Sequence, residues 1–156
     1  MDIQERAEQV YQLFKQHLDS KSFHYDGHDN ERIISLTAQG EDFPMPVIIR
    51  VIAERQVIQI ISPIPGAFPE EKRVDAAVAV ATINNRLMNG CFDLDMSDGA
   101  VRFRLCQSFF GIEISEEVII YLLTILFATV DEFNDSLLMM SKGLISLDQF
   151  IEKTQQ

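Results

Sequence analysis

The stretch GCFDLDMSDGAVRFRLCQ, residues 90–107, carries an Asp98-Gly99 pair between two runs of alternating apolar and polar residues. An Asp-Gly pair in this setting is the strongest short-range signal for a β-hairpin with a two-residue turn. The register set by such a turn matches the cross-strand pairs in chemistry: Met96 with Val101, Asp95 with Arg102, Leu94 with Phe103, Asp93 with Arg104, Phe92 with Leu105, and Cys91 with Cys106. The stretch therefore predicts two antiparallel strands with one apolar face and one ion-paired face.

The acids of this stretch do not form a calcium loop. Such a loop needs Gly at its sixth position and a bidentate Glu at its twelfth. Counted from Asp93, these positions hold Asp98 and Arg104. We therefore expect the carboxylates to pair with arginines rather than to bind a metal.

Cys91 and Cys106 are the only two cysteines, and they face each other in the expected register. They would form a hydrogen-bonded pair with Cα atoms about 5.5 Å apart, a spacing at which a disulfide is geometrically accessible. In a reducing cytoplasm we expect two free thiols. The sequence has no Cys-x-x-Cys and no adjacent His, so it carries no redox or zinc motif.

Length and charge limit the class of protein. The 156 residues fit one domain, residues 1–156, and 24 acidic against 13 basic residues give a net charge of −11. This charge repels phosphate backbones and anionic lipids, so we expect no nucleic-acid partner and no membrane partner. The N-terminus MDIQERAEQ lacks a signal-peptide pattern, and the apolar run Val118–Val130 is shorter than the ~20 residues that span a bilayer. A cytoplasmic location is expected.

Upstream of the hairpin the patterns predict a helix and then three strands. Apolar residues recur at three- and four-residue steps over 3–18, and the next segment, HYDGHDNE, predicts a loop with a short strand at most. Strands in meander order are expected at 32–38, 47–53 and 57–61. Because Ile48 and Ile52 lie opposite the main apolar face, we expect the sheet to be covered on both faces, by its own helices or by a partner.

Two more helices complete the order. One is expected over about 69–89, with an inner stripe of Val74, Ala77, Val78, Ala81 and Met88, and a long one over about 115–142, followed by a short helix in the tail SLDQFIEK. Helix, three strands, helix, two strands and helix make an α+β domain, with helices packed on an antiparallel sheet.

The long helix is apolar on every side between Val118 and Val130, and an all-round apolar helix must be buried all round. A fully internal helix would satisfy this, but a homodimer interface along the helix is the interpretation we favour. Its candidate residues are Ile119, Leu122, Leu123, Leu126, Phe127 and Val130.

No motif for chemistry is present. His24, Asp26 and His28 alternate and would form a chelating face on a strand, but Gly27 and the polar surroundings favour a solvated turn. The sequence has no GxSxG, P-loop, dinucleotide fingerprint or HExxH motif. We therefore expect no catalytic, cofactor-binding or metal residue, no cofactor, and a protein that is not an enzyme.

The run INNRLMNGCFDLDMSDGAVRFRL, residues 83–105, resembles the YbjN-type domain family. In that family a helix ends in Asn-x-Arg-Leu-x-x-Gly-x-Phe-(Asp/Glu) and leads into a hairpin with Asp-Gly. The matching positions are Asn84, Arg86, Leu87, Gly90, Phe92, Asp93, Asp98 and Gly99. The segments before and after resemble the sheet and terminal helix of the family, whereas the cysteines and the HYDGHD loop lie outside the pattern.

The resemblance implies a fold similar to the type III secretion chaperones, small acidic proteins that usually dimerise and bind unfolded client segments. Family members are described as sensory-transduction regulators. We favour structural roles for Asn84, as a partner of backbone groups, and for Arg86, as a partner of a hairpin carboxylate such as Asp93; the alternative is a polar anchor for a peptide or small ligand.

The leading hypothesis is a non-catalytic protein-interaction module, chaperone-like or regulatory, that binds a client protein segment as a homodimer. The alternative is a small-molecule-sensing or enzymatic domain with a pocket between helix and sheet. A deep polar pocket would favour the alternative, and apolar grooves outside the dimer contact would favour the leading hypothesis.

Overall fold

The computed structural model describes residues 1–155. Its elements are, in chain order, α1 (Ile3–Ser20), β1 (Tyr25–His28), β2 (Ile33–Gln39), β3 (Pro44–Ile52), β4 (Val57–Ala67), a 3-10 turn (Glu70–Lys72), α2 (Arg73–Asn84), β5 (Cys91–Leu94), β6 (Ala100–Ser108), α3 (Glu116–Ser141) and α4 (Leu147–Thr154). The predicted α+β class is confirmed.

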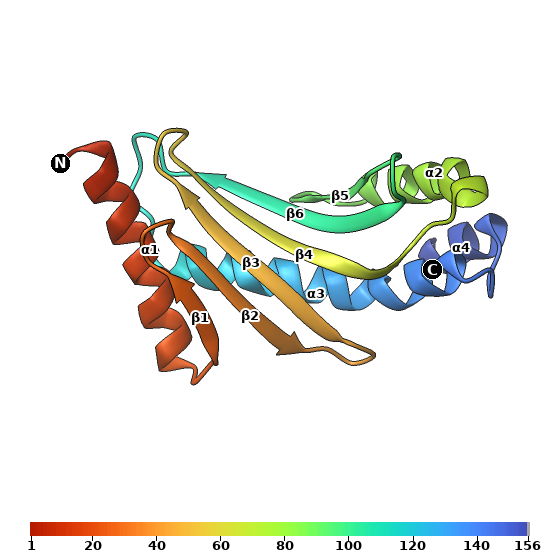
Figure 1. The fold of residues 1–156 in the computed structure, drawn as a ribbon, viewed down its shortest axis with the longest axis horizontal. Helices are drawn as coiled ribbons and strands as arrows, with labels where there is room; N and C mark the ends of the chain where they lie inside the picture. The colour runs from red at the N-terminus through yellow and green to blue at the C-terminus, as the bar shows by residue number, and fades with distance from the viewer. Residues whose placement is uncertain (156) are drawn as a thin grey trace.

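The strands form one antiparallel sheet in the order β1-β2-β3-β4-β6-β5. Figure 1 shows α3 running along the sheet, with α1 at one end and α2 and α4 at the other. Inward residues of every helix and of the central strands form a single hydrophobic core. The buried strand residue Ile61 lies outside that core. The helices therefore cover one face of the sheet, and the other face carries no helix.

Capping residues explain where three helices begin. Asp2 accepts a hydrogen bond from the Glu5 amide at 2.8 Å and Ser115 accepts one from the Val118 amide at 3.3 Å. Ser146 and Gln149 form a reciprocal capping box at α4, the helix predicted in the tail. Each side chain satisfies an amide that the first helical turn leaves without a partner.

The hairpin lies where the Asp98-Gly99 pair predicts it, but its register differs by two residues. Cys91 pairs with Arg104, Phe92 with Phe103, Asp93 with Arg102 and Leu94 with Val101. The Gly99 amide donates to the Asp95 carbonyl at 2.7 Å, so the loop is longer than two residues. A shift of two keeps every side chain on its predicted face. The prediction that the two thiols face each other is therefore wrong.

The segment HYDGHDNE contains a four-residue strand, β1, which pairs with β2, and this agrees with the prediction of a short strand at most. The prediction for the next helix is corrected. The helix predicted over 69–89 is a 3-10 turn followed by α2, which ends at Asn84. Its predicted inner stripe faces outward, since Val74 is 69 % and Val78 43 % exposed and the buried residues are Ala76, Ala79, Val80 and Ile83.

Helix α3 is buried mainly by its own chain. Of the residues expected at a dimer interface, Ile119, Leu122, Leu123, Leu126 and Val130 are buried in the core and Phe127 packs against it. The solvent side carries Ile120, Tyr121 and Thr124. In the described residues no helix is long and apolar enough to cross a membrane.

Asn134 of α3 is 1 % exposed, and neither atom of its amide has a hydrogen-bond partner among residues 1–155. A buried polar group without a partner destabilises the folded state by about 1–3 kcal/mol. We expect Asn134→Leu, which keeps the branched shape of the side chain, to raise the free energy of unfolding by that amount in urea titrations. Asn85→Leu, at an exposed position, is the control and should leave it nearly unchanged. A less stable N134L protein would contradict the prediction.

Candidate interaction surfaces

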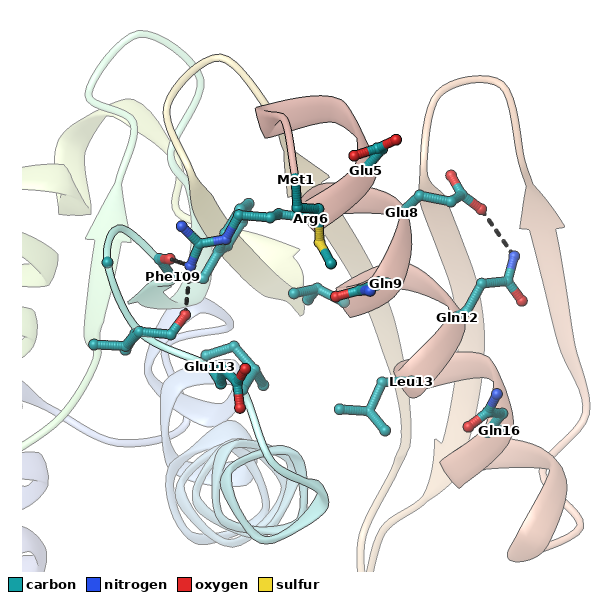
Figure 2. Close-up of a pocket in the computed structure, with 14 residues that line it drawn as sticks. Met1, Glu5, Arg6, Glu8, Gln9, Gln12, Leu13, Gln16, Phe109 and Glu113 are labelled. Atoms are coloured by element: carbon teal, nitrogen blue, oxygen red, sulfur yellow. Dashed lines mark hydrogen bonds between the residues drawn. The ribbon is translucent and has the colours of Figure 1, made fainter.

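An open groove of about 1080 Å³ lies between α1 and the segment 109–114 that leads from β6 to α3. Figure 2 shows Leu13 and Gln9 of α1 facing Glu113 across it. Apolar side chains contribute much of the lining: Met1, Val10, Leu13, Phe109, Ile112 and Ile114. Ile112 is 47 % exposed and Met1 75 %. The groove therefore offers an apolar floor that the chain itself leaves open.

Arg6 fixes the geometry of this groove. One of its guanidinium nitrogens, Nη2, donates to the Phe109 carbonyl at 2.7 Å and to the Ile112 carbonyl at 2.6 Å (Figure 2). Both carbonyls belong to the loop, so α1 and the loop are held together at the groove's end. Charge-assisted bonds of this kind are stronger than neutral ones.

Polar side chains follow α1 along the other rim. Gln9, Gln12, Gln16, Glu5 and Glu8 all line the groove. Gln12 donates to Glu8 at 2.9 Å, and Arg32 pairs with the same carboxylate at 3.1 Å. An apolar floor with amide and carboxylate groups at its rim suits a polypeptide segment, whose side chains and backbone need both kinds of partner.

Asn84, the last residue of α2, bonds to the backbone as predicted. Its amide nitrogen donates to the Phe92 carbonyl at 3.0 Å, and its oxygen accepts from the Phe92 amide at 2.8 Å. It therefore pairs with the outer edge of β5 as a neighbouring strand would. The edge residue Phe92 is closed to strand addition by this side chain.

Gly90 and Gly99 adopt φ near +78°, a backbone conformation that favours glycine. A Cβ atom on Gly99 would lie within 2.9 Å of the Phe68 backbone nitrogen and carbon, and one on Gly90 would lie 3.1 Å from the Arg104 carbonyl oxygen. Gly90 and Gly99, both part of the family pattern, therefore let a neighbouring backbone segment come closer than a side chain would allow.

The hairpin carboxylate pairs with arginines of β6. Asp93 accepts two bonds from Arg104, at 2.7 and 3.2 Å, and one from Arg102 at 3.3 Å. These partners, Arg104 first, hold the pKa of Asp93 below its ordinary value, and Asp93 in turn raises the pKa of Arg104. The Cys91 thiol lies beside them, and burial, together with Asp93, raises its pKa, which disfavours the reactive thiolate. Both cysteines are free.

The prediction for Arg86 is wrong. Its side chain is exposed and forms no ion pair with any residue in 1–155, because Asp93 is already occupied by Arg102 and Arg104. Asp98 accepts a hydrogen bond from the Ala100 amide at 2.8 Å and so closes the hairpin loop.

Acid should weaken the Asp93 cluster. Because the folded-state pKa of Asp93 is depressed, its pairs stabilise the fold above the unfolded value of 3.8, and this is lost as the pH falls through the folded value. We expect Asp93→Asn to lower the free energy of unfolding by about 1–2 kcal/mol at pH 7 and to flatten its fall at acid pH. Urea titrations from pH 7 to pH 3 measure both. Glu132→Gln, at an exposed position of α3, is the control; an equal loss there would contradict the assignment.

Among the described residues no group of three or more His, Cys, Asp or Glu side chains could hold a metal ion. Asp26 and His28 do lie on a strand, pairing with Ser35 and Ile33. The neighbouring turn is fixed instead by Asp29, which accepts from Tyr11 at 2.7 Å and pairs with Lys15 at 3.0 Å. Burial and Asp29 raise the pKa of the Tyr11 hydroxyl, so it remains a donor.

No protein-family model and no curated protein matches the sequence. Solved structures do match. A chain of the ExsC–ExsE complex is similar over 88 % of this chain and 97 % of its own length, with a TM-score of 0.66 and 17 % identity. YbjN, a proposed transcription regulator from E. coli, is similar over 78 % and 89 %, with a TM-score of 0.54 and 17 % identity. This chain has the fold of YbjN and of the type III secretion chaperones.

A third solved structure, the HopA1–SchA chaperone–effector complex, is similar over 92 % of this chain and 96 % of its own, with a TM-score of 0.49 and 12 % identity. The fold that the resemblance implied is confirmed by the similarity to the ExsC–ExsE chain and to YbjN. Of these three structures, one is a chaperone–effector complex and one is a proposed transcription regulator.

Within this YbjN-like fold, α2 carries a second apolar surface, its outer face, defined by Val74, Ala77, Val78 and Ala81. The helix has apolar residues on both sides, because Ala76, Ala79, Val80 and Ile83 face the core. Val74 and Val78 lie one helical turn apart and are exposed. A helix that is apolar on both sides needs a cover on both, and the outer side of α2 is the one that its own chain leaves open.

Sequence reasoning did not find the groove beside α1. Its floor comes from residues far apart in the chain, such as Leu13 and Ile112, and no local pattern brings them together. The one signal was the apolar Phe109-Phe110-Gly111-Ile112 segment, which lies between two predicted elements with no helical or strand period of its own.

Proposed function

We propose that the protein is a non-catalytic protein-interaction module, chaperone-like or regulatory, that binds a segment of a client protein as a homodimer. The observation that carries the proposal is the open apolar groove between α1 and residues 109–114, built on a fold shared with a chain of the ExsC–ExsE complex. That complex joins two different proteins, which supports protein binding for this fold.

The groove favours a protein segment over a small molecule. It is long, following α1 from Met1 to Gln16, and it is open to solvent along the helix (Figure 2). A small-molecule site is usually concave enough to enclose most of its ligand and has a few convergent polar groups. The most polar group here, the Arg6 guanidinium, is occupied by two backbone carbonyls.

The outer face of α2 supports the homodimer. Val74 and Val78 are exposed although the same helix is already packed on its other side. A second copy of α2 would bury this face in an interface with two-fold symmetry. The groove beside α1 lies at the other end of the molecule (Figure 1) and would remain open in such a dimer.

The experiment is affinity capture from the native extract, followed by mass spectrometry, with three baits: the wild-type protein, Ile112→Gln and Leu144→Gln. Ile112 lines the groove, and Leu144, which is 66 % exposed, lies outside it and serves as the matched control. We expect a client that the wild-type and L144Q baits enrich equally and that the I112Q bait enriches about tenfold less, since the apolar contact is lost.

Loss of the client from both variants would place its site elsewhere on the surface. If no protein is enriched by the wild-type bait over an unrelated acidic bait, the proposal is wrong. Circular dichroism of each bait excludes a trivial loss through unfolding.

A further inference from the structure

The helix-free face of the sheet is the least acidic part of this acidic chain. The four central strands β2, β3, β4 and β6 contain none of the 24 acidic residues. Their charged residues are three arginines, Arg50, Arg102 and Arg104, and all three alternate onto the helix-free face. Two acids reach this face from the edge strands: Asp93 of β5, opposite Arg102, and Asp26 of β1, which pairs with Ser35 in the row that continues to Ile48. Three arginines against two acids leave the strands of this face with one net positive charge in a protein of net charge −11.

The arginines are not neutralised by the chain itself. Arg102 and Arg104 share one carboxylate, that of Asp93, and keep 49 % and 37 % of their side-chain surface exposed. Arg50 is exposed and has no ion-pair partner within residues 1–155. The three arginines of this face thus exceed its two acids by one charge, and Arg50 is the arginine that has no partner.

Apolar side chains separate these arginines. Ile48 pairs with Ile61 across β3 and β4, and Ile61 pairs with Arg104 across β4 and β6. Ile61 is only 7 % exposed yet lies outside the hydrophobic core, and Ile48 is half-buried. Neighbouring strands add Ile33, Ile52 and Val57 to the same face. Ile48 and Ile52 are the two residues whose apolar character predicted a second cover for the sheet.

The distance between Arg50 and Arg104 sets the spacing that two carboxylates of a ligand would need. Arg50 and Cys106 are joined through Gln59 in one cross-strand row, and Arg104 lies two residues from Cys106. Two strand spacings of about 4.8 Å and one two-residue step of about 6.8 Å place the Arg50 and Arg104 backbones about 12 Å apart. Acidic residues four positions apart in an extended segment are separated by about 13 Å and point to the same side.

We propose that the helix-free sheet face binds an acidic, extended segment of a protein partner, with two carboxylates on the arginine pair Arg50 and Arg102/Arg104 and an apolar side chain between them on Ile48 and Ile61. The inference rests on the proposed protein-binding function and adds the chemistry of the partner. Complementary charge and apolar contact would make this surface bind an acidic segment in preference to other segments.

The test is fluorescence anisotropy with a short labelled peptide in which two glutamates four positions apart flank an isoleucine, and with its lysine counterpart. We expect the glutamate peptide to bind more tightly, although the protein is negatively charged, and to weaken as salt is raised. The double variant Arg50→Gln/Arg104→Gln should weaken its binding about tenfold, and the single variant Arg50→Gln, which leaves the Asp93 cluster intact, should weaken it in the same direction. Arg86→Gln removes one unpaired surface arginine away from this face and is the matched control. It should change binding less than twofold.

Three results would overturn the inference. The first is that the lysine peptide binds as tightly as the glutamate peptide or more tightly. The second is that the double variant and R86Q lose the same affinity for the glutamate peptide, and the third is that an oligonucleotide binds as tightly as this peptide and its binding is lost in the same variants. If the glutamate peptide binds but only I112Q weakens it, protein binding stands and the sheet face is excluded. If neither peptide binds, the inference about the sheet face is wrong, and if the capture experiment also yields no client, the proposed function is wrong as well.

Discussion

Replacing Gly99 by alanine is expected to lower the free energy of unfolding by about 2–5 kcal/mol. Gly99 has φ +78°, and the left-handed conformation alone costs a residue with a Cβ about 1–2 kcal/mol. The added methyl would also overlap the Phe68 backbone, whose amide donates to the Gly99 carbonyl at 2.9 Å. Overpacking of this kind costs a further ~1–3 kcal/mol. Urea titrations of both proteins measure the difference.

Gly111→Ala is the matched control for this prediction. Gly111 has φ +69°, but an added Cβ meets no atom within 4 Å. Alanine at this position should therefore cost only the backbone contribution of about 1–2 kcal/mol. Equal losses in G99A and G111A would show that the approach of the hairpin loop to Phe68 contributes nothing.

The close approach at Gly99 belongs to a junction that a sequence pattern does not reveal. Arg73, the first residue of α2, donates to the carbonyls of Phe68, Met96 and Ser97 at 3.2–3.3 Å. The start of α2 therefore holds the hairpin loop in place. The family pattern marks Gly99 but not Arg73, whose role depends on contacts with residues 23 and 24 positions away.

The sequence of the hairpin predicts which residues lie on each face of the sheet, but it does not predict the register between the two strands. Alternation fixes which residues point inward, so Phe92 and Phe103 lie in the core, with ring centroids 5.1 Å apart. The loop length is decided by side chains: Asp95 accepts from the amide and hydroxyl of Ser97, at 2.9 and 2.6 Å. These local bonds favour a longer loop over the two-residue turn. The register therefore shifted by two, and the predicted pairs of Cys91 with Cys106 and of Asp95 with Arg102 were lost.

Helix α2 shows a different limit of sequence reasoning. The segment VDAAVAVATI, residues 74–83, has two apolar stripes, and periodicity alone cannot tell which stripe faces the sheet. In the folded chain the inward stripe is Ala76, Ala79, Val80 and Ile83, and the helix packs beside β5 and α4. In α3 the apolar residues that had suggested a dimer interface are buried inside the single chain, against the sheet and α1. The candidate interaction surfaces were therefore found in the three-dimensional arrangement.

The second large effect is expected at the outer face of α2. If this face forms the homodimer interface, Val78→Glu places two carboxylates in an apolar contact, one from each copy. Burying an unpaired charge costs several kcal/mol, so we expect the dimer dissociation constant to rise at least about a hundredfold. Val78 is exposed in the single chain, so the fold itself should keep its stability. Sedimentation equilibrium over a range of concentrations measures the change.

Ile120→Glu separates this interface from one along α3. Ile120 is exposed to the same 43 % as Val78 and lies on the solvent side of α3. A dimer that V78E dissociates and I120E leaves intact places the contact on α2. The reverse result would place it on α3, where the sequence first suggested it, and would leave the apolar outer face of α2 free. A wild-type protein that stays monomeric at every concentration would contradict the homodimer itself, because neither apolar helix face would then be covered by a second copy.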